Sequence, residues 1–155
     1  MAEHRATIDW ANPNEEFTRG RYSREHTWAF DGGVVVQASP SPAVVPAPWS
    51  NEAAVDPEEA YVASVSSCHM LTFLALAAKK RFVVDSYVDD AVGFMEKNED
   101  GRVAVTRVVL RPDIAFSGDR VPGPEDLDRL HHQAHQHCFI ANSVRTEITV
   151  EAPAS

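Results

Sequence analysis

The amino-acid sequence contains little cysteine, little positive charge and no long apolar run. Two cysteines are too few for a disulfide framework, so both are expected to be free thiols in a reducing compartment. The 14 lysines and arginines stand against 23 acidic residues, and the formal net charge of −9 repels phosphate backbones and anionic lipid. The longest apolar stretch, residues 70–78, is about half as long as a bilayer span. We therefore expect no nucleic-acid partner and no membrane partner.

Targeting signals and phosphate-binding motifs are missing as well. The first ten residues, MAEHRATIDW, have no apolar core, which argues against a secretory signal and favours a cytoplasmic protein. The sequence has no glycine-rich phosphate loop and no GxSxG nucleophile motif. Its 44% hydrophobic and 24% charged residues are typical of a globular protein, and 155 residues predict a single domain, residues 1–155.

Turn signals and side-chain periodicity predict an α+β fold of order β-ββ-α-ββ-α-β, with helices packed on antiparallel sheet. The first hairpin has Asp31-Gly32-Gly33 as its turn, because glycine tolerates positive φ. The expected strands are residues 4–10, 26–30, 34–38 and 146–152, together with two alternating runs, 83–98 and 102–118, that form one long antiparallel hairpin around a turn at 99–101.

Helix signals predict a long helix from Asp56 to about Lys80. Asp56 is the expected N-cap, Pro57 takes the first helical position and Glu59 closes a capping box. The middle of this helix is apolar on nearly every face, so we expect a buried central helix. A second helix is predicted over residues 124–138.

The loop between the first hairpin and the long helix is rich in proline. Residues 39–55 hold four of the ten prolines, which rules out regular ladder bonding. The same segment carries the apolar side chains Val44, Val45 and Trp49. A stiff apolar loop of this kind predicts the wall of a substrate pocket.

The cysteines lie in the two predicted helices. Cys68 follows small residues in the middle of the first helix, and Cys138 ends the second. Each has an adjacent histidine, His69 or His137. Free cysteines in cytosolic proteins commonly serve as small core residues, and that interpretation stays open here. Neighbouring positive charge or donors would instead favour a thiolate, and two thiols form a system that oxidises and is reduced again.

Histidines and charged residues offer further candidates with ordinary structural explanations. His131 and His135 share one helix face at a spacing that suits a metal, with the thiols and His69 as additional ligands, but no CxxC or HExxH motif accompanies them. We predict no metal and no cofactor. Glu58 in a first helical turn satisfies free amides and opposes the helix dipole.

The segments DPEEAYVASVSSC and HQHCFIANSVRTEITVE resemble the OsmC/Ohr family of osmotically inducible and organic-hydroperoxide-resistance proteins. In that family a helix-opening Asp/Asn-Pro-Glu precedes the reactive cysteine, and a second cysteine ends a helix shortly before an asparagine. Here Asp56-Pro57-Glu58, Cys68, Cys138 and Asn142 match those positions. The order of elements is also similar over nearly the whole chain.

The resemblance implies a thiol-dependent peroxidase that acts in oxidative stress defence. Cys68 resembles the peroxidatic cysteine, whose thiolate attacks the peroxide and becomes a sulfenic acid. Cys138 resembles the resolving cysteine, which condenses with it to a disulfide. The resemblance also implies an organic hydroperoxide as substrate and an external dithiol, lipoyl or thioredoxin-like, as reductant.

An arginine and a glutamate complete the family's catalytic set. The glutamate corresponds to Glu58 and the arginine to Arg24, with Arg21 as the alternative. An arginine near the sulfur favours the thiolate, and a carboxylate holds the guanidinium through a bidentate pair. Glu58 and Cys68 are separated by about 15 Å along one helix, however. Either the helix breaks between them or the arginine–glutamate pair faces the cysteine of another subunit, and the absence of glycine and proline between them argues against a break. We therefore expect an intertwined two-fold homodimer with shared active sites, as the resemblance also implies.

Two positions depart from the family pattern. Phe139 stands where family peroxidases have a proline, and His69 stands where they have an apolar residue. The alternative function is a non-catalytic OsmC-like protein that binds a small hydrophobic ligand or a metal.

Overall fold

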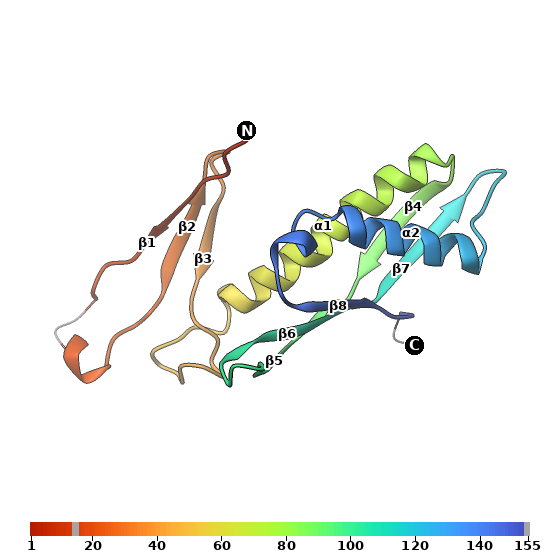
Figure 1. The fold of residues 1–155 in the computed structure, drawn as a ribbon. Coiled ribbons are helices and arrows are strands. Elements are labelled where there is room, and N and C mark those ends of the chain that lie inside the picture. The colour runs from red at the N-terminus through yellow and green to blue at the C-terminus, as the bar shows by residue number, and fades with distance from the viewer. Residues whose placement is uncertain (14–15, 154–155) are drawn as a thin grey trace. The chain divides into compact units, whose positions relative to one another are not determined.

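The computed structural model describes residues 1–13 and 16–153 and contains two compact units, Met1–Ala60 and Tyr61–Ser155 (Figure 1). We call them the N-terminal and the C-terminal unit and describe each by itself. The assignment of all 155 residues to one domain stays a prediction.

The N-terminal unit contains an antiparallel sheet of order β1-β2-β3. Its strands are β1 (Ala6–Asp9), β2 (His26–Phe30) and β3 (Val35–Ala38), with a 3-10 turn, η1 (Phe17–Arg19), between the first two. The predicted hairpin is confirmed: Gly33 has a φ of 93°, and its N–H donates to the Phe30 carbonyl at 3.0 Å.

Few side chains of the N-terminal unit are buried. Among its described residues Ala38 is the one hydrophobic side chain that is buried, and Ser39 and Asp56 are the buried polar ones. The proline-rich loop that follows β3 contains no regular strand over residues 39–55, as predicted, and only an isolated bridge joins Val55 to Ala38. The Ser39 hydroxyl accepts a hydrogen bond from the Asn51 N–H at 2.8 Å across the loop.

The long helix α1 (Pro57–Lys79) begins where the sequence predicts. Asp56 Oδ1 accepts the Glu59 N–H at 2.7 Å, and Glu59 Oε2 accepts the Asp56 N–H at 3.1 Å, so the capping box is confirmed. The helix ends before Arg81, which has a φ of 63°, and the Phe82 N–H then donates to the Ala77 carbonyl.

One face of α1 is buried within the chain, and it consists of residues spaced by four: Val65, His69, Phe73 and Ala77. Leu71 on another face is 61% exposed. With a mean hydropathy of 1.5, α1 is, among the residues that the structure describes, the one helix long and apolar enough to cross a membrane. Length and composition alone are weak support for a membrane span, because core helices of folded proteins share them.

Four strands of the C-terminal unit form the predicted long hairpin with a break in its middle. They are β4 (Val83–Asp89), β5 (Val92–Lys97), β6 (Val103–Leu110) and β7 (Pro112–Ser117), and β4 pairs with β7 while β5 pairs with β6. The register carries on across the break, since Asp89 lies opposite Pro112 and Val92 opposite Val109. Each predicted run is therefore two strands.

Asp89 and Pro112 explain the break. Pro112 has no N–H to donate to a ladder. Asp89 Oδ1 accepts the Arg111 N–H at 2.6 Å, and its other oxygen accepts the Ser66 hydroxyl of α1. The carboxylate thus bonds to helix α1 and to the backbone at the break.

The last strand, β8 (Glu147–Val150), pairs with β6 in parallel orientation. The prediction of antiparallel sheets is wrong for this pair, and the resulting sheet has the order β5-β6-β8. The helix α2 (Pro124–His137) lies in the connection to β8, and a long crossover of this kind is what parallel pairing requires. The α+β class is confirmed.

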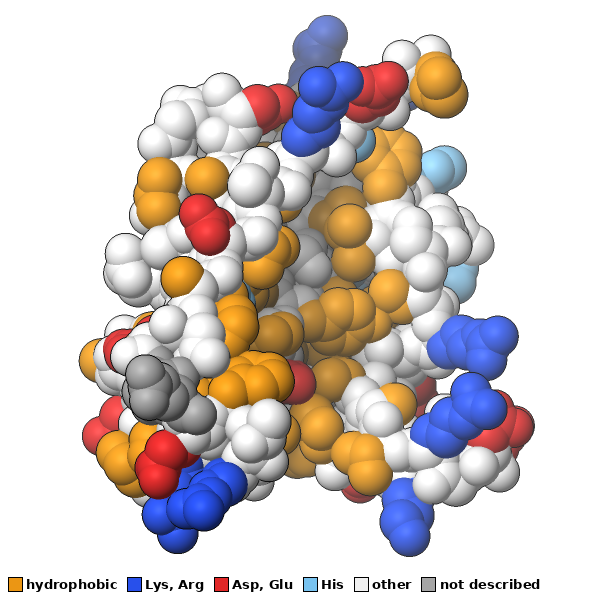
Figure 2. Space-filling model, turned by 90° about the vertical axis from the view of Figure 1, so that its left-hand side faces the viewer, with side chains coloured by type: hydrophobic (Ala, Val, Ile, Leu, Met, Phe, Trp, Pro, Cys, Tyr) orange, Lys and Arg blue, Asp and Glu red, His pale blue; other side chains and the backbone are white. Residues whose placement is uncertain are grey.

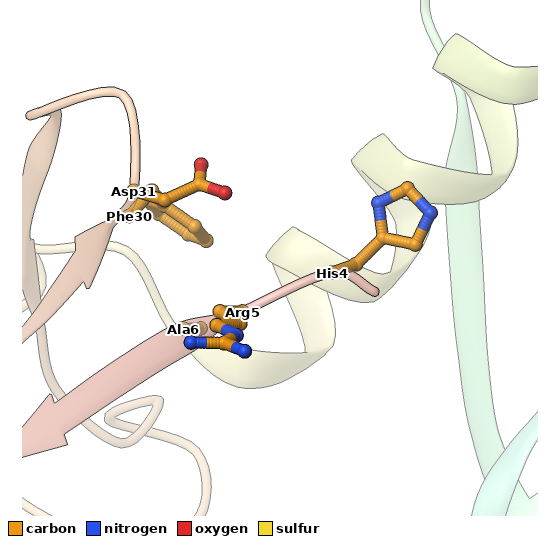
Figure 3. Close-up of a pocket in the computed structure, with 5 residues that line it drawn as sticks. All are labelled: His4, Arg5, Ala6, Phe30 and Asp31. Carbon is orange, nitrogen blue, oxygen red and sulfur yellow. The ribbon is translucent and has the colours of Figure 1, made fainter. Parts of the chain in front are cut away.

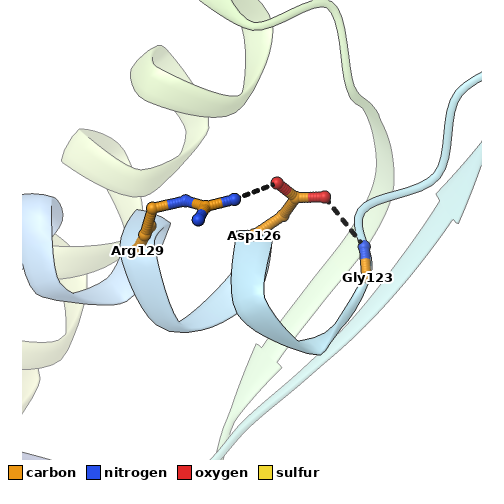
Figure 4. A network of polar contacts seen from close by, with 3 residues as sticks. All are labelled: Gly123, Asp126 and Arg129. Atoms are coloured by element: carbon orange, nitrogen blue, oxygen red, sulfur yellow. Dashed lines mark hydrogen bonds and ion pairs between the residues drawn. The ribbon is translucent and has the colours of Figure 1, made fainter.

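Gly123 is the N-cap of helix α2, and its N–H donates to Asp126 Oδ2 at 3.1 Å (Figure 4). Arg129 donates to the other oxygen of the same carboxylate at 2.8 Å. Asp126 therefore accepts the Gly123 N–H at the start of the helix and also forms an i,i+3 ion pair with Arg129. The buried face of α2 contains Leu130 and Ala134, which join the cluster of Phe73, Ala77 and Phe82. A second cluster is formed by Val65, Val108 and Leu110.

Candidate active site

Helices α1 and α2 bring the two cysteines together within the C-terminal unit. Cys68 lies in the middle of α1 and is half-buried, and Cys138 directly follows α2 and is 1% exposed. Both are free thiols, and they interact closely enough for the Cys68 thiol to affect the titration of Cys138. Two residues that are 70 positions apart in the sequence are therefore neighbours in the fold.

The surroundings of Cys138 keep it in the thiol form. Burial raises the pKa of Cys138, the neighbouring Cys68 raises it further, and the N–H groups of Ala141 and Ile140 partly oppose this. The Ala141 N–H donates to Cys138 Sγ at 3.4 Å. The short helix η2 (Ala141–Ser143) supplies this donor, and the Asn142 N–H donates to the Cys138 carbonyl at 3.0 Å.

The hydroxyl side chains near Cys68 on α1 donate hydrogen bonds to groups other than the Cys68 sulfur. Thr72 Oγ1 donates to the Cys68 carbonyl at 2.9 Å, and the Ser64 hydroxyl donates to the Tyr61 carbonyl at 2.7 Å. Ser66 donates to Asp89, as described above. Of the two cysteines, Cys68 is partly exposed and Cys138 is buried.

His69, the residue after Cys68, is buried and pairs with the half-buried His131 of α2. His69 Nε2 and His131 Nδ1 are 3.0 Å apart, and the two rings are nearly parallel, with an interplanar angle of 10° and centroids 5.3 Å apart. Phe73 covers His131 with its centroid at 4.6 Å. Burial, and then the nearby His131 and His135, lower the pKa of His69 to about 4, so the ring is neutral near pH 7.

The predicted histidine group does not form a ligand cluster. His135 is exposed, while His131 is bonded to His69. Within residues 1–13 and 16–153 the structure contains no group of three or more His, Cys, Asp and Glu side chains arranged to hold a metal ion.

Arg24 is bound by its own loop in the N-terminal unit. Its Nη1 donates to the Tyr22 carbonyl at 2.8 Å, both Nη atoms lie 3.4 Å from the Gly20 carbonyl, and the guanidinium covers the Tyr22 ring at 3.9 Å. Arg21, the alternative, lies 3.7 Å from a carboxylate oxygen of Glu16.

Glu58 has a carboxylate oxygen, Oε2, that is buried and has no hydrogen-bond partner among the described residues. The described part of the chain forms no ion pair between Arg24 and Glu58. The catalytic roles of both residues stay predictions.

The proposed pocket wall lies in the proline-rich loop. Val44 is exposed, Val45 and Trp49 are half-buried, and the Trp49 carbonyl accepts the Arg24 N–H at 3.1 Å. The loop is thereby joined to the segment that carries Arg24. Substrate binding by these side chains stays a prediction.

A separate hollow of about 310 Å³ lies at the start of β1 and the end of β2 (Figure 3). Figure 3 shows His4 and Arg5 on the segment that enters β1, Phe30 at the end of β2 and Asp31 directly after it. Its lining residues, which also include Ala6, are all exposed, and neither cysteine is among them. The hollow therefore does not contain the thiol pair.

Comparisons with known proteins place the chain in a family. The OsmC-like protein family matches residues 50–152, and the chain therefore belongs to it. An OsmC-like protein of unknown function from Vibrio cholerae is 56% identical, with a TM-score of 0.95 over 98% of this chain and 99% of that one. No curated protein matches the chain.

More distant solved structures share the fold. An organic hydroperoxide resistance protein from Elizabethkingia anophelis is 18% identical, with a TM-score of 0.71 over 98% of this chain and 97% of that one. An organic hydroperoxide resistance protein OsmC from Legionella pneumophila is 11% identical, with a TM-score of 0.72 over 99% and 98%. The predicted family and fold are confirmed.

Sequence reasoning missed the pairing of His69 with His131. It named His69 as the neighbour of Cys68, as a further metal ligand and as a departure from the family pattern, and it named His131 as a candidate metal ligand beside His135. The spacing held a usable signal, because His69 lies four residues from both Val65 and Phe73 on the face that is buried.

Proposed function

We propose that this protein is a thiol peroxidase that reduces organic hydroperoxides with Cys68 and Cys138. The observation that carries the proposal is the pair of neighbouring thiols, one accessible on α1 and one buried after α2. Membership of the OsmC-like family and the shared fold with organic hydroperoxide resistance proteins support it.

The accessible sulfur takes the first step. The Cys68 thiolate attacks one oxygen of the hydroperoxide, the O–O bond breaks, and the alcohol leaves after taking a proton, so that Cys68 becomes a sulfenic acid. Cys138 then attacks the Cys68 sulfur, a disulfide forms, and water is released. An external dithiol reduces the disulfide and is itself oxidised to a disulfide.

The raised pKa of Cys138 supports this division of roles. A buried thiol with a raised pKa is a poor first nucleophile toward a peroxide in solution. Once Cys68 is oxidised, the same burial keeps competing peroxide away from Cys138. Cys68 is therefore the proposed peroxidatic residue and Cys138 the resolving residue.

We also propose that the protein acts in the cytoplasm as a homodimer in which Arg24 and Glu58 assist the chemistry. The N-terminal unit supports the dimer, because its sheet leaves Ile8, Phe30 and Val35 exposed and Ala38 is its one buried hydrophobic residue among those described. Figure 2 shows hydrophobic side chains at the surface of the molecule. A second copy would cover such side chains.

Thiol titration tests the proposed function. One equivalent of cumene hydroperoxide is expected to remove two thiols per reduced chain. Cys68→Ser is expected to abolish the reaction, and Cys138→Ser to allow one oxidation without turnover, with sulfenic or sulfinic acid on Cys68 by mass spectrometry. An unchanged thiol content in the unsubstituted protein would refute the peroxidase and favour a binding protein.

A further inference from the structure

The His69–His131 pair joins the two helices that carry the thiols. His69 directly follows Cys68 on α1. His131 lies seven residues before Cys138, which is about two helical turns, so it shares a face of α2 with the position where the resolving cysteine follows. The bond of 3.0 Å between Nε2 and Nδ1 therefore connects the segments that hold the two sulfurs.

The His69–His131 hydrogen bond lies where few other hydrogen-bond partners are available. His69 is 1% exposed, and Phe73 covers the His131 ring. A neutral imidazole has one N–H and one acceptor nitrogen, so the bond needs one ring of the pair to present an N–H and the other a lone pair. Loss of the His131 ring leaves a nitrogen of the buried His69 ring without this hydrogen bond.

We propose that His69 and His131 are positioning residues that hold the end of α2 against α1, so that Cys138 meets Cys68 in the disulfide-forming step. This inference rests on the proposed function and deepens it. Disulfide formation requires Cα atoms within about 7 Å and a defined torsion, which two separate helices satisfy only in a fixed arrangement. The attack of Cys68 on a peroxide does not involve Cys138 or the end of α2.

The proposal separates the two chemical steps. Loss of the pair lets the end of α2 move away from α1, which lowers the effective concentration of Cys138 at Cys68. The sulfenic acid on Cys68 then persists, and a second peroxide oxidises it to a sulfinic acid. The first oxidation keeps its rate.

Four variants test the role of the bond. His69→Leu and His131→Leu remove it. His69→Gln restores a polar atom near the position of Nε2, and His131→Asn restores one near the position of Nδ1. His132→Gln, on the exposed side of α2, is the matched control. Phe82→Leu is the control for general destabilisation, because it lowers the stability of the core cluster that contains Phe73 and leaves both histidines in place.

The first measurement is the equilibrium of the Cys68–Cys138 disulfide with glutathione, which reports the effective concentration of the thiols without a peroxide. We expect both Leu variants to lower the equilibrium constant at least about tenfold, or about 1.4 kcal/mol. The Gln and Asn variants should stay within about threefold of the unsubstituted protein, as should both controls.

The second measurement is rapid mixing with cumene hydroperoxide, followed by quenching and mass spectrometry. The Leu variants should accumulate sulfinic acid on Cys68, while the rate of the first oxidation stays within about twofold. An unchanged glutathione equilibrium in the Leu variants would overturn the proposal, as would an equal loss in Phe82→Leu. If the unsubstituted protein forms the disulfide with glutathione but does not react with cumene hydroperoxide, the proposed function is refuted and the positioning role is not.

Discussion

Acid should destabilise the folded protein through one buried group, His69. Its pKa is lowered to about 4 by burial first and then by His131 and His135. Burial also lowers the pKa of its partner His131, and the carboxylates of Asp128 on α2 and Asp89 on β4 partly oppose that shift. The unfolded chain therefore takes up a proton on this imidazole in a pH range in which the folded chain does not.

The sign and size follow from the two pKa values. Stability is fully present above the ordinary pKa of 6.5 and is lost as the pH falls toward about 4, because the unfolded state binds the extra proton. The free energy of unfolding should fall by about 2 kcal/mol between pH 7 and pH 5 through His69 alone, and by about 3 kcal/mol at pH 4.

Urea unfolding of the reduced protein at one protein concentration, followed by circular dichroism, measures this loss. His69→Gln is the matched variant, because it removes the titrating ring and retains a hydrogen-bonding group at the same place. The unsubstituted protein should lose about 2 kcal/mol more than His69→Gln between pH 7 and pH 5. Parallel curves for the two proteins would refute the argument that His69 is buried as a neutral ring.

Further predictions concern the helix start, the substrate and the assembly. Asp56→Ala should lower the free energy of unfolding by about 1 kcal/mol in urea titrations, whereas Asp56→Asn, which retains an N-cap oxygen, should cost less. Cumene hydroperoxide should react faster than hydrogen peroxide in stopped-flow measurements, and Trp49→Ala should lower the ratio of the two second-order rate constants. Equal or reversed rate constants in the unsubstituted protein would contradict an apolar pocket. Light scattering of active protein at micromolar concentration should give twice the mass of one chain, and the mass of a single chain would exclude the dimer.

Local signals in the sequence predicted the elements that local physics determines. Asp56 and Glu59 form the expected reciprocal cap, and Gly33 closes the expected hairpin. The two cysteines also meet as the family resemblance implies. In each of these cases the residues that determine the outcome are close in sequence or belong to a motif.

Long-range features were harder to predict because their partners are distant in the sequence. The break in the long hairpin depends on Asp89, which binds Ser66 of α1 and the backbone of Arg111 at once. The parallel pairing of β8 depends on where the connection through α2 returns to the sheet. The side-chain periodicity of a single run of residues indicates neither the contacts of Asp89 nor the strand with which β8 pairs.

The continuity of α1 limits how Glu58 takes part in the proposed chemistry. The helix runs without a break from Pro57 to Lys79, so Glu58 precedes Cys68 by ten residues, or about 15 Å along the axis. A carboxylate at that distance cannot hold an arginine against the sulfur of its own straight helix. The buried Oε2 of Glu58 has no partner among the described residues, and Arg24 donates to the carbonyls of Gly20 and Tyr22. We therefore predict that these two residues take part in catalysis only across a second copy of the chain, and this prediction connects the expected dimer with the proposed peroxidase.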